Sequence, residues 1–229
     1  MPVPSKPMST GPANERLPPD LAQLIDGTRG FMPEDEGLAL HATALRFFGG
    51  GVAVEIGTYC ARSTIYLAHA ASVRGSTVVT IDHHRGSEEQ QPGWEYHDES
   101  LVDPALGIMD TLPFARRAIA ASGLEELVVA MVGRSSEISR WWRTPLDLVF
   151  VDGGHTDEHA QNDFHGWSPW IRVGGALVIH DVFPDPADGG QAPYTIYRSA
   201  IDGGEFVEVS VTGSLRVLER VTPPPQAVT

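Results

Sequence analysis

The sequence of residues 52–64 reads VAVEIGTYCARST. Residues 52–56 are a short apolar run rich in β-branched side chains, which is typical of a buried strand. Gly57 permits the unusual backbone angles of a tight turn, and Ser63 or Thr64 can cap the helix that we expect next. Backbone N–H groups at the start of such a helix bind carboxylate or phosphate groups. The stretch therefore predicts a strand, a turn and a helix that together receive an anionic part of a ligand.

Strand and helix patterns alternate on both sides of this stretch. Short apolar runs predict buried strands, and apolar residues spaced three or four apart predict helices. The predicted strands cover residues 52–56, 77–81, 127–132, 147–151 and 175–179, and the predicted helices cover residues 21–25, 34–48, 63–72, 111–121, 135–142 and 157–170. Residues 205–211 and 214–218 predict a closing hairpin. We therefore expect an α/β fold: a Rossmann-like, doubly wound, mostly parallel seven-stranded sheet with a C-terminal antiparallel hairpin.

The length and composition of the chain narrow its class. Its 229 residues suit one domain with extensions. We expect a flexible Pro-rich arm over residues 1–19, N-terminal helices over 20–50, the main domain over 51–220 and a flexible tail over 221–229. The net charge of −14 gives no electrostatic basis for binding nucleic acid or an anionic membrane. With a single Cys and no signal-peptide pattern, the chain is expected to be a cytoplasmic enzyme without disulfides.

An acidic residue at the end of the next predicted strand indicates a nucleoside ligand. Asp82 ends the predicted strand after Gly57, where a carboxylate can accept hydrogen bonds from ribose hydroxyls. A solvated Asp beside a simple capped turn is the structural alternative. The turn lacks both the dinucleotide pattern G-x-G-x-x-G and the phosphate-loop pattern G-x-x-x-x-G-K-[ST]. A cofactor with a carboxylate and no phosphate fits better, and S-adenosylmethionine is such a cofactor.

Three segments carry a family resemblance: VEIGTYCARSTIYLA from Val54, VVTIDHH from Val78 and DLVFVDGGHTDE from Asp147, the last continued by GGALVIHDV. They resemble class I S-adenosylmethionine-dependent methyltransferases over roughly residues 50–220. The resemblance implies that Glu55 lies near the methionine amino group, that Asp82 holds the ribose, and that residues 133–136 border the adenine. The cofactor-binding residues implied in this way are Glu55, Gly57, Thr58, Tyr59, Ser63, Asp82, Arg134, Ser135 and Asp152. Ala61 departs from the second glycine of many members.

Acidic residues also follow the later strands. Asp152 and Asp181 end two strands that are adjacent in this fold, and paired carboxylates favour Mg²⁺, which lowers the pKa of a bound hydroxyl. Simple capping of the next segments is the alternative. His155 is a candidate general base, and His180 is a competing base or a nitrogen ligand. The chain resembles the metal-dependent sugar O-methyltransferase branch, which implies Mg²⁺ on Asp152 and Asp181 and His155 as the base. That branch commonly has an acidic pair where this chain has His180-Asp181.

Residues 155–159 also match H-x-x-E-H, a zinc peptidase pattern. That chemistry needs both histidines on one face of a helix, whereas His155 comes directly after two glycines that follow a strand. We therefore rank a zinc hydrolase behind a methyltransferase. A non-catalytic cofactor binder also ranks behind it, because Asp152, His155 and Asp181 together form a catalytic set.

The long connection over residues 83–98 is the candidate acceptor loop. Its rings and polar groups suit a sugar, and we name His83, His84, Trp94, Tyr96 and His97 as substrate-binding; a solvated insertion is the alternative. The stretch resembles sugar 1-O-methyltransferases of methylmannose polysaccharide precursors, which implies a short mannoside methylated on its reducing-end hydroxyl. A phenolic natural product is the other acceptor considered.

Residues 183–193 form a second flexible piece near this site. The N-terminal helices either pair two copies in a homodimer or cover the cofactor.

Overall fold

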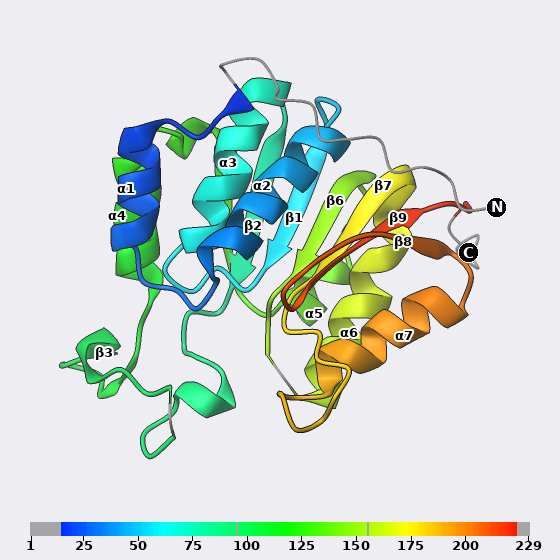
Figure 1. The fold of residues 1–229 in the computed structure, drawn as a ribbon. Coiled ribbons are helices and arrows are strands. Elements are labelled where there is room, and N and C mark those ends of the chain that lie inside the picture. Colours follow the sequence, from blue (N-terminus) through cyan, green and yellow to red (C-terminus); the bar gives the residue numbers. More distant parts are fainter. Residues whose placement is uncertain (1–14, 95, 155, 224–229) are drawn as a thin grey trace.

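A computed structural model describes residues 15–94, 96–154 and 156–223, and a seven-stranded sheet runs through its centre (Figure 1). The order across the sheet is β5-β2-β1-β6-β7-β9-β8. The strands are β1 (Val52–Ile56), β2 (Thr77–Asp82), β5 (Val128–Val132), β6 (Leu146–Val151), β7 (Ile171–Ile179), β8 (Phe206–Thr212) and β9 (Leu215–Arg220). The first five are parallel, whereas β9 is antiparallel to both β7 and β8. The predicted fold class is confirmed.

Helices cover both faces of this sheet (Figure 1). They are α1 (Pro19–Gly27), α2 (Glu34–Phe47), α3 (Arg62–Arg74), α4 (Leu112–Ala121), α5 (Ser135–Ser139), α6 (Asp157–Trp167) and α7 (Ala192–Asp202). Alternate residues of each strand point to opposite faces, so Ala53 packs toward α2 and α3 while Val54 packs toward α5, α6 and α7. Helices α1 and α4 pack against α3. Because both faces are covered, the central strands are mainly apolar, with Glu55 of β1 as a buried exception.

The structure differs from the expected elements in several places. Strand β7 begins at Ile171, four residues earlier than predicted, and helix α6 ends at Trp167. Helix α7 was not predicted, because it follows the Gly-, Pro- and Asp-rich residues 183–190 and has a proline in its first turn. Helix α5 ends at Ser139, earlier than predicted. The acceptor loop also continues into a small two-stranded sheet of β3 (Val102–Asp103) and β4 (Ile108–Met109).

The N-terminal helices correspond to α1 and α2. The arm predicted over residues 1–19 and the tail predicted over 221–229 fall for the most part outside the described residues. Within the described ranges, no helix combines the length and the apolar character that crossing a membrane requires. What matters for function is that five parallel strands end at one edge, where their following residues meet.

Candidate functional site

A cavity of about 1220 Å³ lies along this edge, between the strand ends and the acceptor loop. Its walls also include the connection from α1 to α2 and the residues that precede α7. The cavity is large enough for a nucleoside cofactor together with an acceptor. Most of the predicted site residues line it: Gly57, Thr58, Tyr59, Ser63, Asp82, His83, Trp94, Tyr96, Arg134, Ser135, Asp152, His180 and Asp181.

The turn after β1 brings two backbone segments into contact. Gly57 has a φ of +99°, and a Cβ atom there would collide with the carbonyl oxygen of Asp152. Tyr59 and Ala61 also have positive φ, at 47° and 74°. The Asp82 carboxylate accepts hydrogen bonds from the backbone N–H of Tyr59 (2.8 Å) and of His84 (2.7 Å). These bonds fix Asp82 at the cavity wall and leave lone pairs for ribose hydroxyls.

Glu55 lies behind this turn and is not among the described residues that line the cavity. Its fully buried carboxylate accepts hydrogen bonds from the hydroxyls of Ser63 (2.6 Å), Thr64 (2.5 Å) and Thr80 (2.6 Å). Burial raises the pKa of Glu55 to about 7, although these hydrogen bonds act in the opposite direction. In this arrangement Glu55 holds the start of α3 against the sheet.

A further acidic side chain, Asp163, is among the residues that line the cavity. It accepts a short hydrogen bond from the Ser135 hydroxyl, and burial raises the pKa of its carboxyl to about 6. We did not select this residue from the sequence. The available signal was an acidic residue on the same helix face as the buried Ala160, Phe164 and Trp167.

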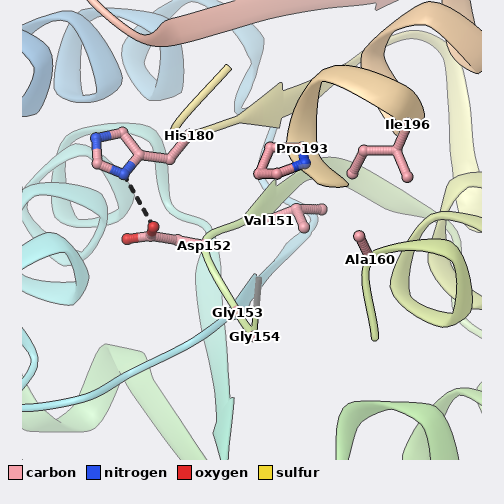
Figure 2. A pocket seen from close by; sticks show the side chains of 8 residues that line it. All are labelled: Val151, Asp152, Gly153, Gly154, Ala160, His180, Pro193 and Ile196. Carbon is pink, nitrogen blue, oxygen red and sulfur yellow. Dashed lines mark hydrogen bonds and ion pairs between the residues drawn. The ribbon is translucent and has the colours of Figure 1, made fainter. Parts of the chain in front are cut away.

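Three potential metal ligands meet at the ends of β6 and β7. Ligand atoms of Asp152, His180 and Asp181 all lie within 4.8 Å of one another. Nδ1 of His180 is 2.9 Å from Oδ1 of Asp152 and 3.5 Å from Oδ2 of Asp181. Figure 2 shows His180 and Asp152 facing each other beside a small pocket whose apolar wall includes Pro193 and Ile196 of α7.

A residue from α2 completes this cluster. Nε2 of His180 lies 2.5 Å from Oε2 of Glu36. Burial alone lowers the pKa of His180, but the charge of Asp152 and the hydrogen bonds to Asp152, Asp181 and Glu36 outweigh it and raise the pKa to about 12. The three carboxylates around His180 therefore favour the protonated form of its imidazole.

The cluster fits a divalent cation. It offers two carboxylates and the Nδ1 position of His180 on one side, with hydrogen bonds orienting the imidazole from the other. A cation binding there takes the place of the Nδ1 proton, since a metal-bound imidazole is neutral.

His155, the predicted general base, lies outside the described residues. Helix α6 begins only at Asp157, with the Thr156 side chain accepting a hydrogen bond from the His159 backbone N–H. Of the two histidines of the H-x-x-E-H pattern, only His159 lies among the described residues, in the first turn of α6.

Of the predicted substrate-binding residues in the acceptor loop, some line the cavity and others do not. Trp94 and Tyr96 are 55% and 47% exposed and line the cavity with His83. His84 is instead buried, and its Nδ1 lies 2.7 Å from the Thr111 hydroxyl. The Nδ1 atom of His97 lies 2.9 Å from the Gln90 carbonyl oxygen. Neither histidine is among the described residues that line the cavity.

Phe31 is a cavity residue that the sequence did not reveal. Its ring lies 5.3 Å from the ring of Tyr59 and 5.4 Å from that of Tyr96, so it joins the turn after β1 to the acceptor loop. It belongs to the connection between α1 and α2, and nothing in its local pattern distinguishes it from a loop residue.

Residues 54–182, which span β1 to the end of β7, match the family described as a methyltransferase domain. The chain belongs to this methyltransferase family. The match includes the Gly57 turn, Asp82, and the cluster of Asp152, His180 and Asp181. It excludes α2, so Glu36 lies outside the matched region.

Curated relatives resemble the methyltransferase over short stretches. It is 32% identical over 75 residues to demethylmacrocin O-methyltransferase of Streptomyces fradiae, covering 28% of this chain and 19% of that protein. It is 40% identical over 50 residues to mycinamicin VI 2''-O-methyltransferase of Micromonospora griseorubida, covering 21% of this chain and 12% of that protein. The methyltransferase therefore spans less than a fifth of the length of the first relative and less of the second.

Solved structures share the fold of the methyltransferase over most of its length. The O-methyltransferase TomG of Streptomyces achromogenes, in complex with S-adenosylmethionine, superposes with a TM-score of 0.62 at 18% identity, covering 90% of this chain and 92% of TomG. The O-methyltransferase NovP gives a TM-score of 0.62 at 17% identity, covering 82% of this chain and 80% of NovP.

Proposed function

We propose that the protein is an S-adenosylmethionine-dependent O-methyltransferase acting on a sugar hydroxyl. The observation that carries this proposal is the Asp82 carboxylate, held by two backbone N–H groups beside the Gly57 turn and within the large cavity. This arrangement suits a ribose, while the turn lacks the glycines that a diphosphate needs. TomG, which shares the fold, is described in complex with S-adenosylmethionine.

The residues around the cavity take separate roles in this proposal. The Gly57–Tyr59 turn and Ser63 receive the methionine carboxylate, Asp152 the amino group, and Arg134 and Ser135 the adenine end. The bound cofactor supplies an electrophilic methyl group. The walls position the acceptor hydroxyl in line with it, and positioning of this kind accounts for a large part of enzymatic rate enhancement.

In this proposal His155 is the general base that removes the proton of the acceptor hydroxyl. It follows Asp152 by three residues, and Asp152 lies at the cavity wall and in the metal cluster. A neutral imidazole suits this task near pH 7. A divalent cation such as Mg²⁺ on Asp152, His180 and Asp181, when bound, lowers the pKa of a coordinated hydroxyl.

Sugar chemistry is favoured by the composition of the acceptor wall. The exposed rings of Trp94 and Tyr96, with Phe31 next to Tyr96, offer apolar faces, while His83 and nearby acidic and amide groups offer hydrogen bonds. The finer proposal is a short methylated mannoside that receives the methyl group on its reducing-end 1-hydroxyl. The two curated relatives are named for demethylmacrocin and mycinamicin VI as acceptors.

Calorimetry with S-adenosylhomocysteine tests the cofactor site. We expect binding to the full chain, weakened roughly 10- to 100-fold by Asp82→Ala, since hydrogen bonds to a charged acceptor contribute about 1.5–3 kcal/mol. Glu125→Ala is the control, because Glu125 is an exposed acid outside the cavity. No heat with S-adenosylhomocysteine, but tight binding of a nicotinamide dinucleotide, contradicts the proposal. Methyl transfer from labelled cofactor to mannosides, other glycans and phenolics then identifies the acceptor class.

Substitution of His155 tests the base. We expect His155→Ala to bind S-adenosylhomocysteine normally but to lose turnover by roughly 10²- to 10⁴-fold, the usual contribution of a general base. His165→Ala is the matched control, because His165 is exposed on α6 and does not line the cavity. Turnover of His155→Ala at the rate of the unsubstituted protein rejects His155 as the base.

A further inference from the structure

Glu36 is a buried carboxylate that the matched methyltransferase region does not contain. It lies in the first turn of α2 and is only 4% exposed, whereas its neighbours Glu34 and Asp35 are exposed. Burying a carboxylate is unfavourable unless it is paired and hydrogen-bonded. Its surroundings therefore have to compensate for the lost hydration.

Two segments far along the chain provide this compensation. Oε1 of Glu36 accepts a hydrogen bond from the Ser214 backbone N–H (2.5 Å), and Oε2 accepts from the Ser214 hydroxyl (3.2 Å) and from Nε2 of His180 (2.5 Å). Gly213, with a φ of +51°, allows this approach, because a Cβ atom there would collide with Oε1 of Glu36. The turn between β8 and β9 thus fixes the orientation of Glu36.

The fixed carboxylate in turn determines which face of His180 points to the cluster. An ionised carboxylate only accepts hydrogen bonds, so Nε2 of His180 is the donor in this pair. Nδ1 then faces Asp152 and Asp181, at 2.9 and 3.5 Å. A histidine that binds a metal through one nitrogen commonly donates its other N–H to a carboxylate, which sets its orientation.

We propose that Glu36 is a positioning residue that holds His180 with Nδ1 toward Asp152 and Asp181, so that α2 and the β8–β9 turn complete a divalent-cation site. This inference rests on the proposed function, in which that cation assists the acceptor hydroxyl. One imidazole and two carboxylates form a ligand set that accepts Mn²⁺ as well as Mg²⁺. Mn²⁺ is therefore a suitable probe.

The experiment measures Mn²⁺ binding to the full chain by electron paramagnetic resonance, without any turnover. We expect the unsubstituted protein to bind Mn²⁺ and Glu36→Ala to bind it roughly 10- to 100-fold more weakly, the usual effect of removing an outer hydrogen-bond partner. Asp35→Ala, an exposed acid in the same helical turn, keeps the original affinity. Binding of S-adenosylhomocysteine, measured in parallel, reports that each variant is folded.

A double substitution separates positioning from a general structural effect. If Glu36 acts through His180, then Glu36→Ala causes no further loss of Mn²⁺ affinity in a His180→Ala background. If Glu36→Ala does not fold, Glu36→Gln replaces it. His180 and the Ser214 N–H bond to different oxygens of Glu36, and in glutamine one of these positions carries an NH₂ group, which donates and does not accept.

The contrary outcomes are distinct. Equal Mn²⁺ affinity of the unsubstituted protein and a folded Glu36 variant overturns the positioning role, and so do additive losses in the double variant. Absence of Mn²⁺ binding to a protein that still binds S-adenosylhomocysteine also overturns it. Absence of S-adenosylhomocysteine binding contradicts the proposed function instead.

Discussion

At the scale of single residues, Gly57 combines two constraints that only glycine meets. Its φ of +99° is unfavourable for other residues, and the Asp152 carbonyl occupies the position of a side chain. We expect Gly57→Ala to lower the free energy of unfolding by about 2 kcal/mol or more and to weaken S-adenosylhomocysteine binding. Urea unfolding and calorimetry measure the two effects.

Gly75→Ala is the control for this prediction. Gly75 has a φ of +68° at the end of α3, but nothing lies within 4 Å of the added Cβ atom. It therefore carries only the cost of the backbone conformation, about 1 kcal/mol. If both variants lose the same small amount of unfolding free energy, the close contact of Gly57 with the Asp152 carbonyl does not exclude a side chain.

Sequence patterns identify residues when the signal is local. Gly57 and Asp82 could be predicted because each directly follows a recognisable strand. Glu36 could not, since its partners His180 and Ser214 lie 144 and 178 residues away and nothing near it distinguishes it from the exposed Glu34 and Asp35. The position of Glu55 behind the turn likewise depends on the hydroxyls of two other elements.

At the scale of elements, α2 and α3 are joined by a buried pair of histidines. Nε2 of His41 lies 2.8 Å from Nδ1 of His69, so one nitrogen donates and the other accepts. Burial, followed by the charge of His69, lowers the pKa of His41 to about 4. Protonation of either ring breaks this bond or places a charge in the helix interface.

The pair makes stability depend on pH. Because the folded pKa of His41 lies below the unfolded value of about 6.5, the unfolded chain binds more protons between these values. The free energy of unfolding is therefore expected to fall by up to about 3 kcal/mol as the pH decreases from 7.5 toward 4. Urea unfolding at several pH values measures the change.

His41→Gln is the comparison for this prediction, since an amide keeps a polar contact with His69 and does not titrate. Glu55 and Asp163, whose raised pKa values act in the opposite direction, are present in both proteins and cancel in the difference. Parallel pH profiles for the two proteins show that the histidine pair is not responsible.

Element prediction succeeded where the pattern was strong. Strands β1, β2 and β6 are mainly apolar runs that end at or just before Gly or Asp, and each was predicted within one residue of its observed limits. The start of β7 was predicted four residues too late. Helix α7 was missed because its apolar positions, such as Ile196 and Ala200, follow a segment whose composition indicates a loop. Its contribution to the pocket wall beside His180 was missed with it.

At the scale of the whole molecule, the mostly parallel sheet and the edge at which the cavity lies followed from the alternation of strands and helices. Parallel strands place their ends at one edge, so Asp82, Asp152 and Asp181 were expected together there. The contacts of α2 and of the β8–β9 turn with this edge were not predictable. They depend on how the N-terminal helices and the final hairpin pack against the sheet.

Glu36 accepts hydrogen bonds from both His180 and Ser214, so assembly of this cluster depends on the order in which the chain is synthesised. A nascent chain emerging from the ribosome presents Glu36 early. Ser214, which donates a hydrogen bond to Glu36, is synthesised 178 residues later. Contacts of such long separation form late in folding. A chain that stops before Ser214 lacks the hydrogen bonds that orient Glu36, so the proposed cation site is complete only once the β8–β9 hairpin has formed.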